Sequence, residues 1–156
     1  MINNIGVYLT YENIYLVSNW GVLPFWLMLM VIPNHGFTKF FVHSIVAPFL
    51  LAAAYIFLAY KIYLNENIFG GLNLYLGLDN LYAVFSDEAF LLIFWLHFLS
   101  ISLFVGSWIA RDSCKYLIPK ILTILSLILS YFSGPVGLVF YWLVRIFYAK
   151  KIGFND

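Results

Sequence analysis

Long apolar runs make up most of this chain, and short polar segments separate them. A helix needs about 20 apolar residues to cross a bilayer, because it rises about 1.5 Å per residue. Four runs meet that requirement: Ile14–Ile32, Val42–Leu64, Glu88–Ala110 and Leu117–Tyr148. The pattern therefore predicts an all-α, polytopic membrane helical bundle of about four transmembrane helices, with residues 1–156 forming a single transmembrane domain.

The fourth run is longer than one straight span. Its residues would measure about 48 Å as a helix, against about 30 Å of hydrocarbon. Gly134-Pro135 interrupts the run, and proline kinks a helix by removing a backbone hydrogen bond. We expect one helix kinked at Gly134-Pro135. Two shorter helices that turn back at this point are the alternative, and their turn would need protein or water around its polar groups.

The polar segments predict connections and sidedness. Residues 33–36 read Pro-Asn-His-Gly, which is typical of a turn, and Ser86-Asp87-Glu88 is a helix start signal. Four spans place several cations on one side, which the positive-inside rule assigns to the cytoplasm. With four spans, Lys150-Lys151 would lie on the opposite side, which contradicts that rule. A five-helix arrangement would instead place them on the cytoplasmic side. The cations grouped on the first side are Lys39, Arg111, Lys115 and Lys120.

Composition supports the membrane assignment. Of the 156 residues, 64% are hydrophobic and 10% are charged, whereas about 25% are charged in soluble domains. A short soluble chain could not bury so much apolar surface. The formal net charge of +1 gives no field for nucleic acid. The first residues match neither a signal peptide nor a transit peptide, so we expect a bacterial or organelle-encoded protein, with the bacterial inner membrane as the location.

One face of the third run carries polar residues at helical spacing. His97, Ser100, Phe104, Ser107 and Arg111 follow one another at intervals of three or four residues. Ionisable groups at membrane depth usually face the interior of a bundle. We therefore expect His97 to point inward, either as a ligand contact or proton donor, or as a neutral ring that is hydrogen-bonded to a neighbouring helix.

Other residues suggest a ligand more than a cofactor. Trp26 and Trp95 are flanked by apolar residues, and such aromatic walls suit a long apolar polyene. His43 and His97 lie at different predicted depths, so we expect neither a haem nor a metal site. The chain lacks the motifs of serine hydrolases, zinc proteases and phosphate-binding loops.

Four segments together resemble a known family. They read VLPFWLMLMVIPN, GGLNLYLGL, FSDEAFLLIFWLHFLSISLFVGSWIARDS and FSGPVGLVFYWLVR. These stretches are similar to the neoxanthin synthase family, also called the abscisic-acid-deficient-4-like family, from about Trp20 to Arg145. The shared features are a Trp-x-His in the third run, an Arg-Asp pair at its end, and a Gly-Pro-x-Gly in the fourth.

The resemblance implies carotenoid chemistry. Plant members of the family are linked to converting violaxanthin into neoxanthin, in which an epoxide opens to an allene without a redox cofactor. Such an isomerisation needs an acid near the epoxide oxygen and a base near the departing proton. The resemblance assigns catalytic roles to His97, Arg111 and Asp112. The ligand contacts that we expect are Trp95, Ser100, Ser102, Phe104, Trp26 and His43.

The chain departs from the family pattern at Ser102, where an acidic residue is frequent. If that carboxylate is the acid or base of the family, this chain lacks it. The leading hypothesis is a protein of the lipid bilayer that binds a carotenoid or another apolar polyene, and that isomerises it. The alternative is a non-catalytic accessory subunit of a larger membrane complex, and a homo-oligomer is also compatible with the sequence.

Overall fold

The computed structural model describes residues 10–44, 46–65, 75–150 and 153. Helices account for all the regular structure in this part of the chain, which confirms the all-α prediction. In chain order they are α2 (Tyr11–Val31), α3 (Gly36–Phe41), α4 (Val46–Asn65), α5 (Leu78–Phe85), α6 (Glu88–Lys115), α7 (Lys120–Ser133) and α8 (Pro135–Ala149).

Local sequence signals fix where the two longest helices begin. The Thr10 side chain accepts a hydrogen bond from the backbone N–H of Asn13 at the start of α2. The Asp87 carboxylate accepts from the N–H groups of Ala89 and Phe90, at 2.9 and 3.1 Å, at the start of α6. Both residue types are favoured caps, because they satisfy backbone donors that have no partner within the helix. The helix start predicted at residues 86–88 is confirmed.

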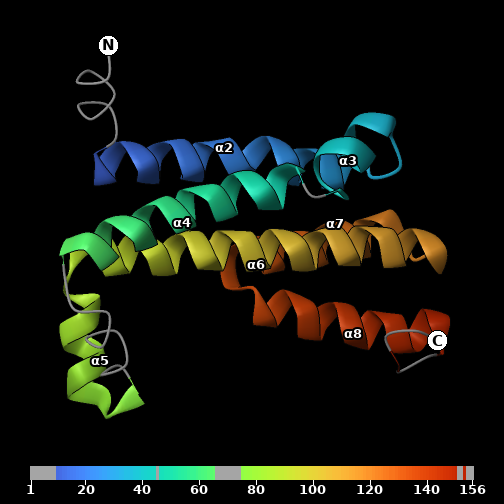
Figure 1. Cartoon of the computed structure of the whole chain (residues 1–156). Helices are drawn as coiled ribbons and strands as arrows, with labels where there is room; N and C mark the ends of the chain where they lie inside the picture. The colour runs from blue at the N-terminus through green and yellow to red at the C-terminus, as the bar shows by residue number, and fades with distance from the viewer. Residues whose placement is uncertain (1–9, 45, 66–74, 151–152, 154–156) are drawn as a thin grey trace.

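Helix α6 is the centre of the fold. It packs against α2, α4 and α7, and these long helices lie side by side in Figure 1, while α5 stands across them at one end. The core contains Trp26, Leu96 and Leu103, all at most 2% exposed. Gly106 is required in this core, because a Cβ there would lie 2.7 Å from the Trp26 ring.

Two helices of the described chain, α2 and α6, are long and apolar enough to cross a membrane. The predicted number of four spans is therefore not reproduced. The second predicted run is divided, since α4 begins only at Val46 and a turn over residues 42–44 separates it from α3. The apolar parts of α4, α7 and α8 are each shorter than a full span.

The prediction of one kinked helix at Gly134-Pro135 is wrong. Helices α7 and α8 form an antiparallel hairpin that turns at Gly134, whose φ of 44° suits a glycine. Pro135 is the first residue of α8, where a proline needs no N–H. Gly137 then lets the two helices touch, because a Cβ on it would collide with the backbone of Ser130. The hairpin is the alternative of two shorter helices.

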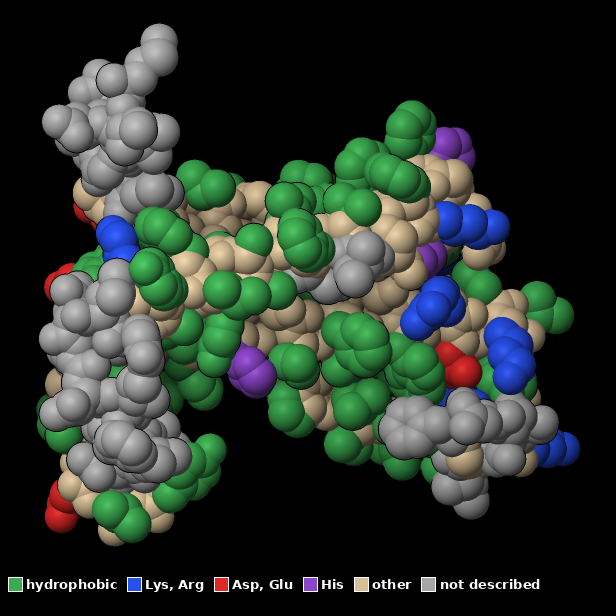
Figure 2. All heavy atoms as spheres, in the orientation of Figure 1, with side chains coloured by type: hydrophobic (Ala, Val, Ile, Leu, Met, Phe, Trp, Pro, Cys, Tyr) green, Lys and Arg blue, Asp and Glu red, His purple; other side chains and the backbone are tan. Residues whose placement is uncertain are grey.

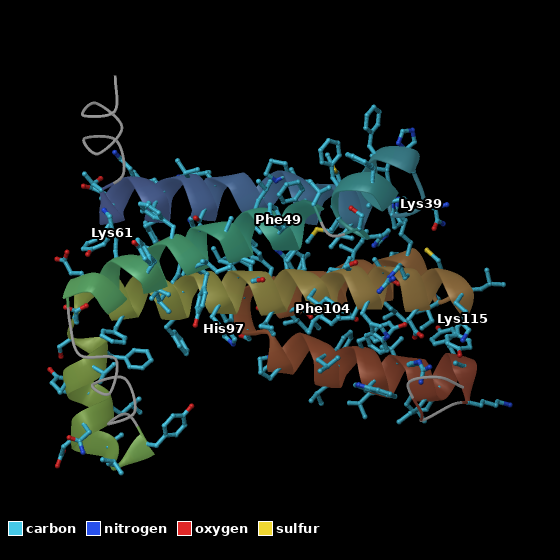
Figure 3. All side chains as sticks on the ribbon, in the orientation of Figure 1. Lys39, Phe49, Lys61, His97, Phe104 and Lys115 are labelled. Carbon is cyan, nitrogen blue, oxygen red and sulfur yellow. The ribbon has the colours of Figure 1, made fainter. Side chains whose placement is uncertain are left out.

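The hairpin gathers cations at one end of the bundle. Helix α8 returns toward the end of α6, so Lys150 joins Lys115 and Lys120, and the Lys120 ammonium donates to the Val31 carbonyl at 3.1 Å. Figure 2 shows blue side chains gathered at this end, and Figure 3 labels Lys39 and Lys115 there, with Lys61 at the opposite end. Four straight spans would have put Lys150 on the side opposite to the other cations, against the positive-inside rule. In the structure Lys150 lies at the same end as they do, so this conflict does not arise.

Candidate functional site

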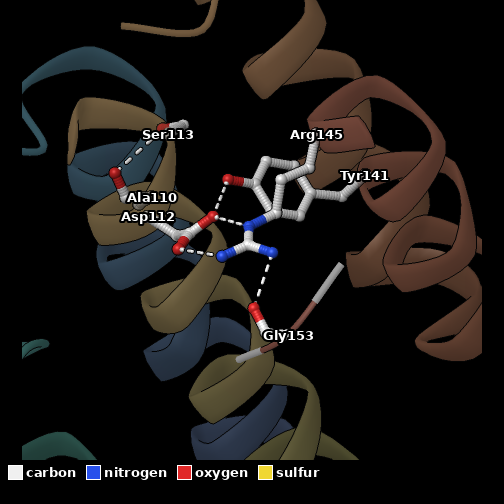
Figure 4. Close-up of polar contacts among 6 residues, drawn as sticks. All are labelled: Ala110, Asp112, Ser113, Tyr141, Arg145 and Gly153. Atoms are coloured by element: carbon white, nitrogen blue, oxygen red, sulfur yellow. Dashed lines mark hydrogen bonds and ion pairs between the residues drawn. The ribbon is translucent and has the colours of Figure 1, made fainter. Parts of the chain in front are cut away.

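A buried ion pair joins α6 to α8. Arg145 Nε donates to Asp112 Oδ2 at 2.7 Å, and the Tyr141 hydroxyl donates to the same oxygen at 2.6 Å (Figure 4). Arg145 and Tyr141 are 0% exposed, and Asp112 is 7% exposed. Buried charges are tolerated when they are paired and hydrogen-bonded, as here. Asp112, Tyr141 and Arg145 are called the buried triad below.

Aromatic rings and backbone complete the surroundings of the guanidinium. Arg145 lies over the rings of Tyr116 and Trp142, at 4.9 and 5.0 Å from their centroids. Its Nη1 donates to the carbonyl oxygen of Gly153 at 2.8 Å. These contacts use the donors of Arg145 and the oxygens of Asp112, so the buried triad holds α8 and the chain after it against the end of α6.

The sequence predicted only one member of this triad. Asp112 was expected beside Arg111 as a polar corner, but Arg111 is exposed, because successive residues on a helix point about 100° apart. Asp112 turns inward instead and pairs with Arg145. The available signal was Arg145 itself, the lone charged residue between Lys120 and Lys150 in an apolar run. Such a residue needs a partner at depth.

His43 has a structural role, and the hydroxyl of Ser107 is one of its two hydrogen-bond partners. Its Nε2 lies 3.1 Å from the Pro33 carbonyl and its Nδ1 lies 2.8 Å from the Ser107 hydroxyl. A carbonyl can only accept, so Nε2 donates to Pro33 and Nδ1 accepts from Ser107. Burial lowers the pKa of His43. The hydrogen bond to Pro33 raises this pKa, and the nearby charges of Arg111 and Lys39 lower it further, so the pKa lies below its ordinary value. The ring therefore ties the turn before α4 to α6.

Helices α2 and α4 cover parts of the first half of α6, but the short hairpin does not extend along all of it, and cavities lie on the side that is left open. Gly134 reaches only as far as Ser102 and Phe98 along α6. Two cavities of about 490 Å³ each border the first half of α6, and one of about 300 Å³ lies at the turn itself. The first, the α5-side cavity, is lined by Tyr11, Tyr15, Phe85, Glu88, Leu91 and Trp95, among others.

The other two cavities continue along α6. The middle cavity is bordered by Tyr15, Asn19, Phe94, Trp95, Phe98 and Tyr131. The turn cavity is bordered by His97, Phe98, Ser102, Val105, Gly134 and Leu138. Because neighbouring cavities share Tyr15, Phe94, Trp95 and Phe98, we treat the three as one aromatic groove. Figure 2 shows the surface hollowed between α5 and α8.

His97 does not face the interior. Its side chain is exposed and lies at the edge of the turn cavity, with its ring centroid 6.4 Å from that of Tyr55. Figure 3 shows it projecting from α6. The prediction of an inward imidazole is therefore wrong, because the ring lies on a face of α6 that the described helices leave exposed.

Ser102 borders the same cavity from a buried position. It is 4% exposed and belongs to the lining of the turn cavity. Its Oγ would lie 3.4 Å from a Cβ built on Gly134. The structure thus brings His97 and Ser102 to one cavity, although they do not share a face of α6.

Trp95 also fits the expectation of a groove. Its ring lines the α5-side and middle cavities and lies 5.4 Å from that of Phe98 and 6.1 Å from that of Tyr15. Its Nε1 is buried and finds no hydrogen-bond partner in the part of the chain that the structure describes. Buried donors normally have a partner, so this indole N–H is an exception within the described residues.

Several predicted contacts lie elsewhere. Trp26 is 2% exposed and packs in the core against Tyr131 and Gly106. Phe104 is 59% exposed. Neither of them, nor Ser100, borders the aromatic groove. Within the described residues, no three His, Cys, Asp or Glu side chains come together to hold a metal ion.

Comparison with known proteins gives one family and one curated relative. The family model described as ABA DEFICIENT 4-like matches residues 13–141. Protein ABA DEFICIENT 4, chloroplastic, from Arabidopsis thaliana is 27% identical over 137 residues, which are 86% of this chain and 61% of that protein. The chain thus spans less than two thirds of its relative. No solved structure matches the chain.

Proposed function

The chain belongs to the ABA DEFICIENT 4-like family, and from this membership we propose that it is a membrane protein that binds a carotenoid or a similar apolar polyene in the aromatic groove. The observation that carries the proposal is the aromatic groove along the first half of α6. Its lining residues run from Glu88 to Val105, about 25 Å along the helix. A long, mostly apolar groove with several aromatic walls suits an elongated apolar molecule.

The proposed orientation follows from the charges. Helix α6 crosses the membrane, and the end with Lys115, Lys120 and Lys150 faces the cytoplasm or its equivalent, as the positive-inside rule requires. Helix α5 would then lie along the opposite surface beside the open end of the groove, where its exposed Leu78 and Tyr82 meet lipid. The name of the relative places that protein in the chloroplast, and a bacterial inner membrane stays our prediction for this chain.

The finer proposal is an isomerisation in the turn cavity. A C–O bond of an epoxide breaks, a proton leaves a neighbouring carbon, and the oxygen gains a proton, so atoms balance and no redox partner is needed. His97 is the residue at this cavity whose side chain can serve as an acid or a base. Arg111 and Asp112 lie about 21 and 22 Å from it along α6, so we assign them no part in that step.

Pigment analysis tests the binding. The full chain is produced in a carotenoid-producing host and purified in mild detergent, and its visible spectrum and extracted pigments are recorded. We expect a co-purified carotenoid, and we expect Leu138→Trp to lose it by filling the turn cavity. Leu143→Trp is the matched control, because Leu143 lies on the same helix but is 55% exposed.

A colourless wild-type protein, with host pigments that are identical with and without the gene, would contradict the binding. The isomerisation is tested separately by supplying an epoxide-bearing carotenoid and following its isomer by chromatography. Pigment that binds but remains unchanged would leave the binding proposal standing and remove the catalytic one.

A further inference from the structure

We propose that the end of the bundle formed by α3 and the last turns of α6 binds an anionic phospholipid. Lys39 and Arg111 contact the phosphate of its headgroup, and the exposed phenylalanines of α3 contact its acyl chains. This lipid site depends on the proposed membrane location. It lies on a different surface from the aromatic groove and takes a different ligand from the pigment.

Charges are divided between the two ends of the bundle. In the described ranges, the acids at the end where α2 and α6 begin are Glu12, Asp79, Asp87 and Glu88. At the other end the described acid is Asp112, and its carboxylate is already held by Arg145 and Tyr141. The cations that gather at that end (Figure 2) are Lys39, Arg111, Lys115, Lys120 and Lys150. This excess of positive charge is complementary to an anionic partner.

The contacts of His43 bring Lys39 and Arg111 to one site. The ring of His43 joins the Pro33 carbonyl, at 3.1 Å, to the Ser107 hydroxyl of α6, at 2.8 Å. Arg111 lies one helical turn beyond Ser107 on the same face of α6. Besides burial, the positive charges of Arg111 and Lys39 lower the pKa of His43, so both lie near its ring. Both side chains are exposed, so a headgroup at the membrane surface can reach them.

Helix α3 supplies the apolar half of the site. Phe37 and Phe40 are 62% and 60% exposed, and together with Phe41 they border a hollow of about 420 Å³. Their spacing of three and four residues places them on one face of the helix, while Lys39 lies on another. A soluble anion would use the cations alone, whereas an anionic phospholipid matches both the cations and these exposed rings.

Lipid titration of the purified full-length protein in mild detergent tests the site. The probes are dioleoyl phosphatidylglycerol, which is anionic, and dioleoyl phosphatidylcholine, which has the same acyl chains and no net charge. Native mass spectrometry measures the lipid retained, and the unfolding temperature measures the stabilisation. We expect phosphatidylglycerol to bind about tenfold more tightly, because each cation near an anionic surface contributes about fivefold. Added salt should reduce this preference.

The variant Lys39→Gln/Arg111→Gln removes both charges. We expect the preference for phosphatidylglycerol to fall to about twofold or less, while phosphatidylcholine binding and the unfolding temperature without lipid stay unchanged. Lys61→Gln is the matched control, because Lys61 lies at the opposite end of the bundle (Figure 3). Phe37→Ser/Phe40→Ser should weaken the binding of both lipids by a similar factor, because it removes acyl-chain contacts and leaves the charges.

Equal binding of the two lipids by the wild-type protein, or the same loss of preference in Lys61→Gln, would overturn the lipid site. Glycerol 3-phosphate carries the phosphate without acyl chains and should leave the unfolding temperature unchanged. A rise equal to that with phosphatidylglycerol would replace the lipid by a soluble anion. Neither result alters pigment binding, whereas a protein that prefers phosphatidylglycerol but binds no pigment would remove the proposed function alone.

Discussion

Arg145 of α8 and Asp112 of α6 form an ion pair at 2.7 Å that is sealed from solvent, with Arg145 0% and Asp112 7% exposed. The two residues are 33 positions apart, and their contact holds the hairpin against the central helix. The same hairpin limits how much of α6 is covered. Its position therefore determines both the stability of this end of the bundle and the extent of the aromatic groove.

Removing one partner of this pair is expected to be severely destabilising. Arg145→Met leaves the Asp112 carboxylate buried without its counter-charge, and such changes cost about 3–5 kcal/mol. Thermal unfolding in detergent, followed by circular dichroism, measures the loss. The double variant Asp112→Leu/Arg145→Met removes both charges, so no unpaired charge stays buried, and it should recover part of the stability. A double variant less stable than Arg145→Met would contradict this explanation.

The close contact within the hairpin gives a second prediction. Gly137→Ala places a Cβ against the Ser130 backbone, which cannot move without separating α7 from α8. Overpacking of this kind typically costs about 1–3 kcal/mol, and we expect the upper part of that range. Gly21→Ala is the control, because a Cβ there meets nothing within 4 Å. A Gly137→Ala protein as stable as wild type in the same unfolding assay would rule out the hairpin.

Trp95 is expected to matter for binding more than for folding. Trp95→Phe removes a buried N–H that has no partner in the described chain, so the free energy of unfolding of the pigment-free protein should fall little. The affinity for pigment should fall several-fold, because the indole ring lines two of the three cavities. Fluorescence titration measures the affinity. Trp20→Phe, which changes a residue that is 66% exposed, should leave it unchanged.

His43 predicts a dependence of stability on pH. Burial holds its pKa below the ordinary value of about 6.5, so the folded state binds fewer protons than the unfolded state in the window below that value. The contribution of His43 to stability is therefore complete above pH 6.5 and is lost as the pH falls below it. Unfolding temperatures at pH 7.5 and 5.5 measure the effect.

The matched variant for this measurement is His43→Gln, which cannot titrate. Its unfolding temperature should fall less than that of the wild type between the two pH values. Identical pH dependence in the two proteins would show that the ring is not held in its neutral form.

Local signals accounted for much of what could be predicted. The Asp87 cap, the start of α6 and the apolar character of α2 and α6 follow from residues that are neighbours in sequence. The aromatic walls at Trp95 were also predicted, and the structure places that residue in the groove. By contrast, the stripe that begins at His97 was not a single site. Ser107 is used by His43, while His97 is exposed at a different cavity.

The sequence by itself determined an apolar, all-α chain and its family, because helix length, capping and composition depend on short stretches of residues. Only the tertiary structure decided the direction of the chain after Gly134. A Gly-Pro pair is compatible with a kink or with a reversal, and the choice depends on contacts between distant residues, such as Gly137 with Ser130 and Arg145 with Asp112. That reversal decided in turn which side of α6 is buried and where the groove remains open.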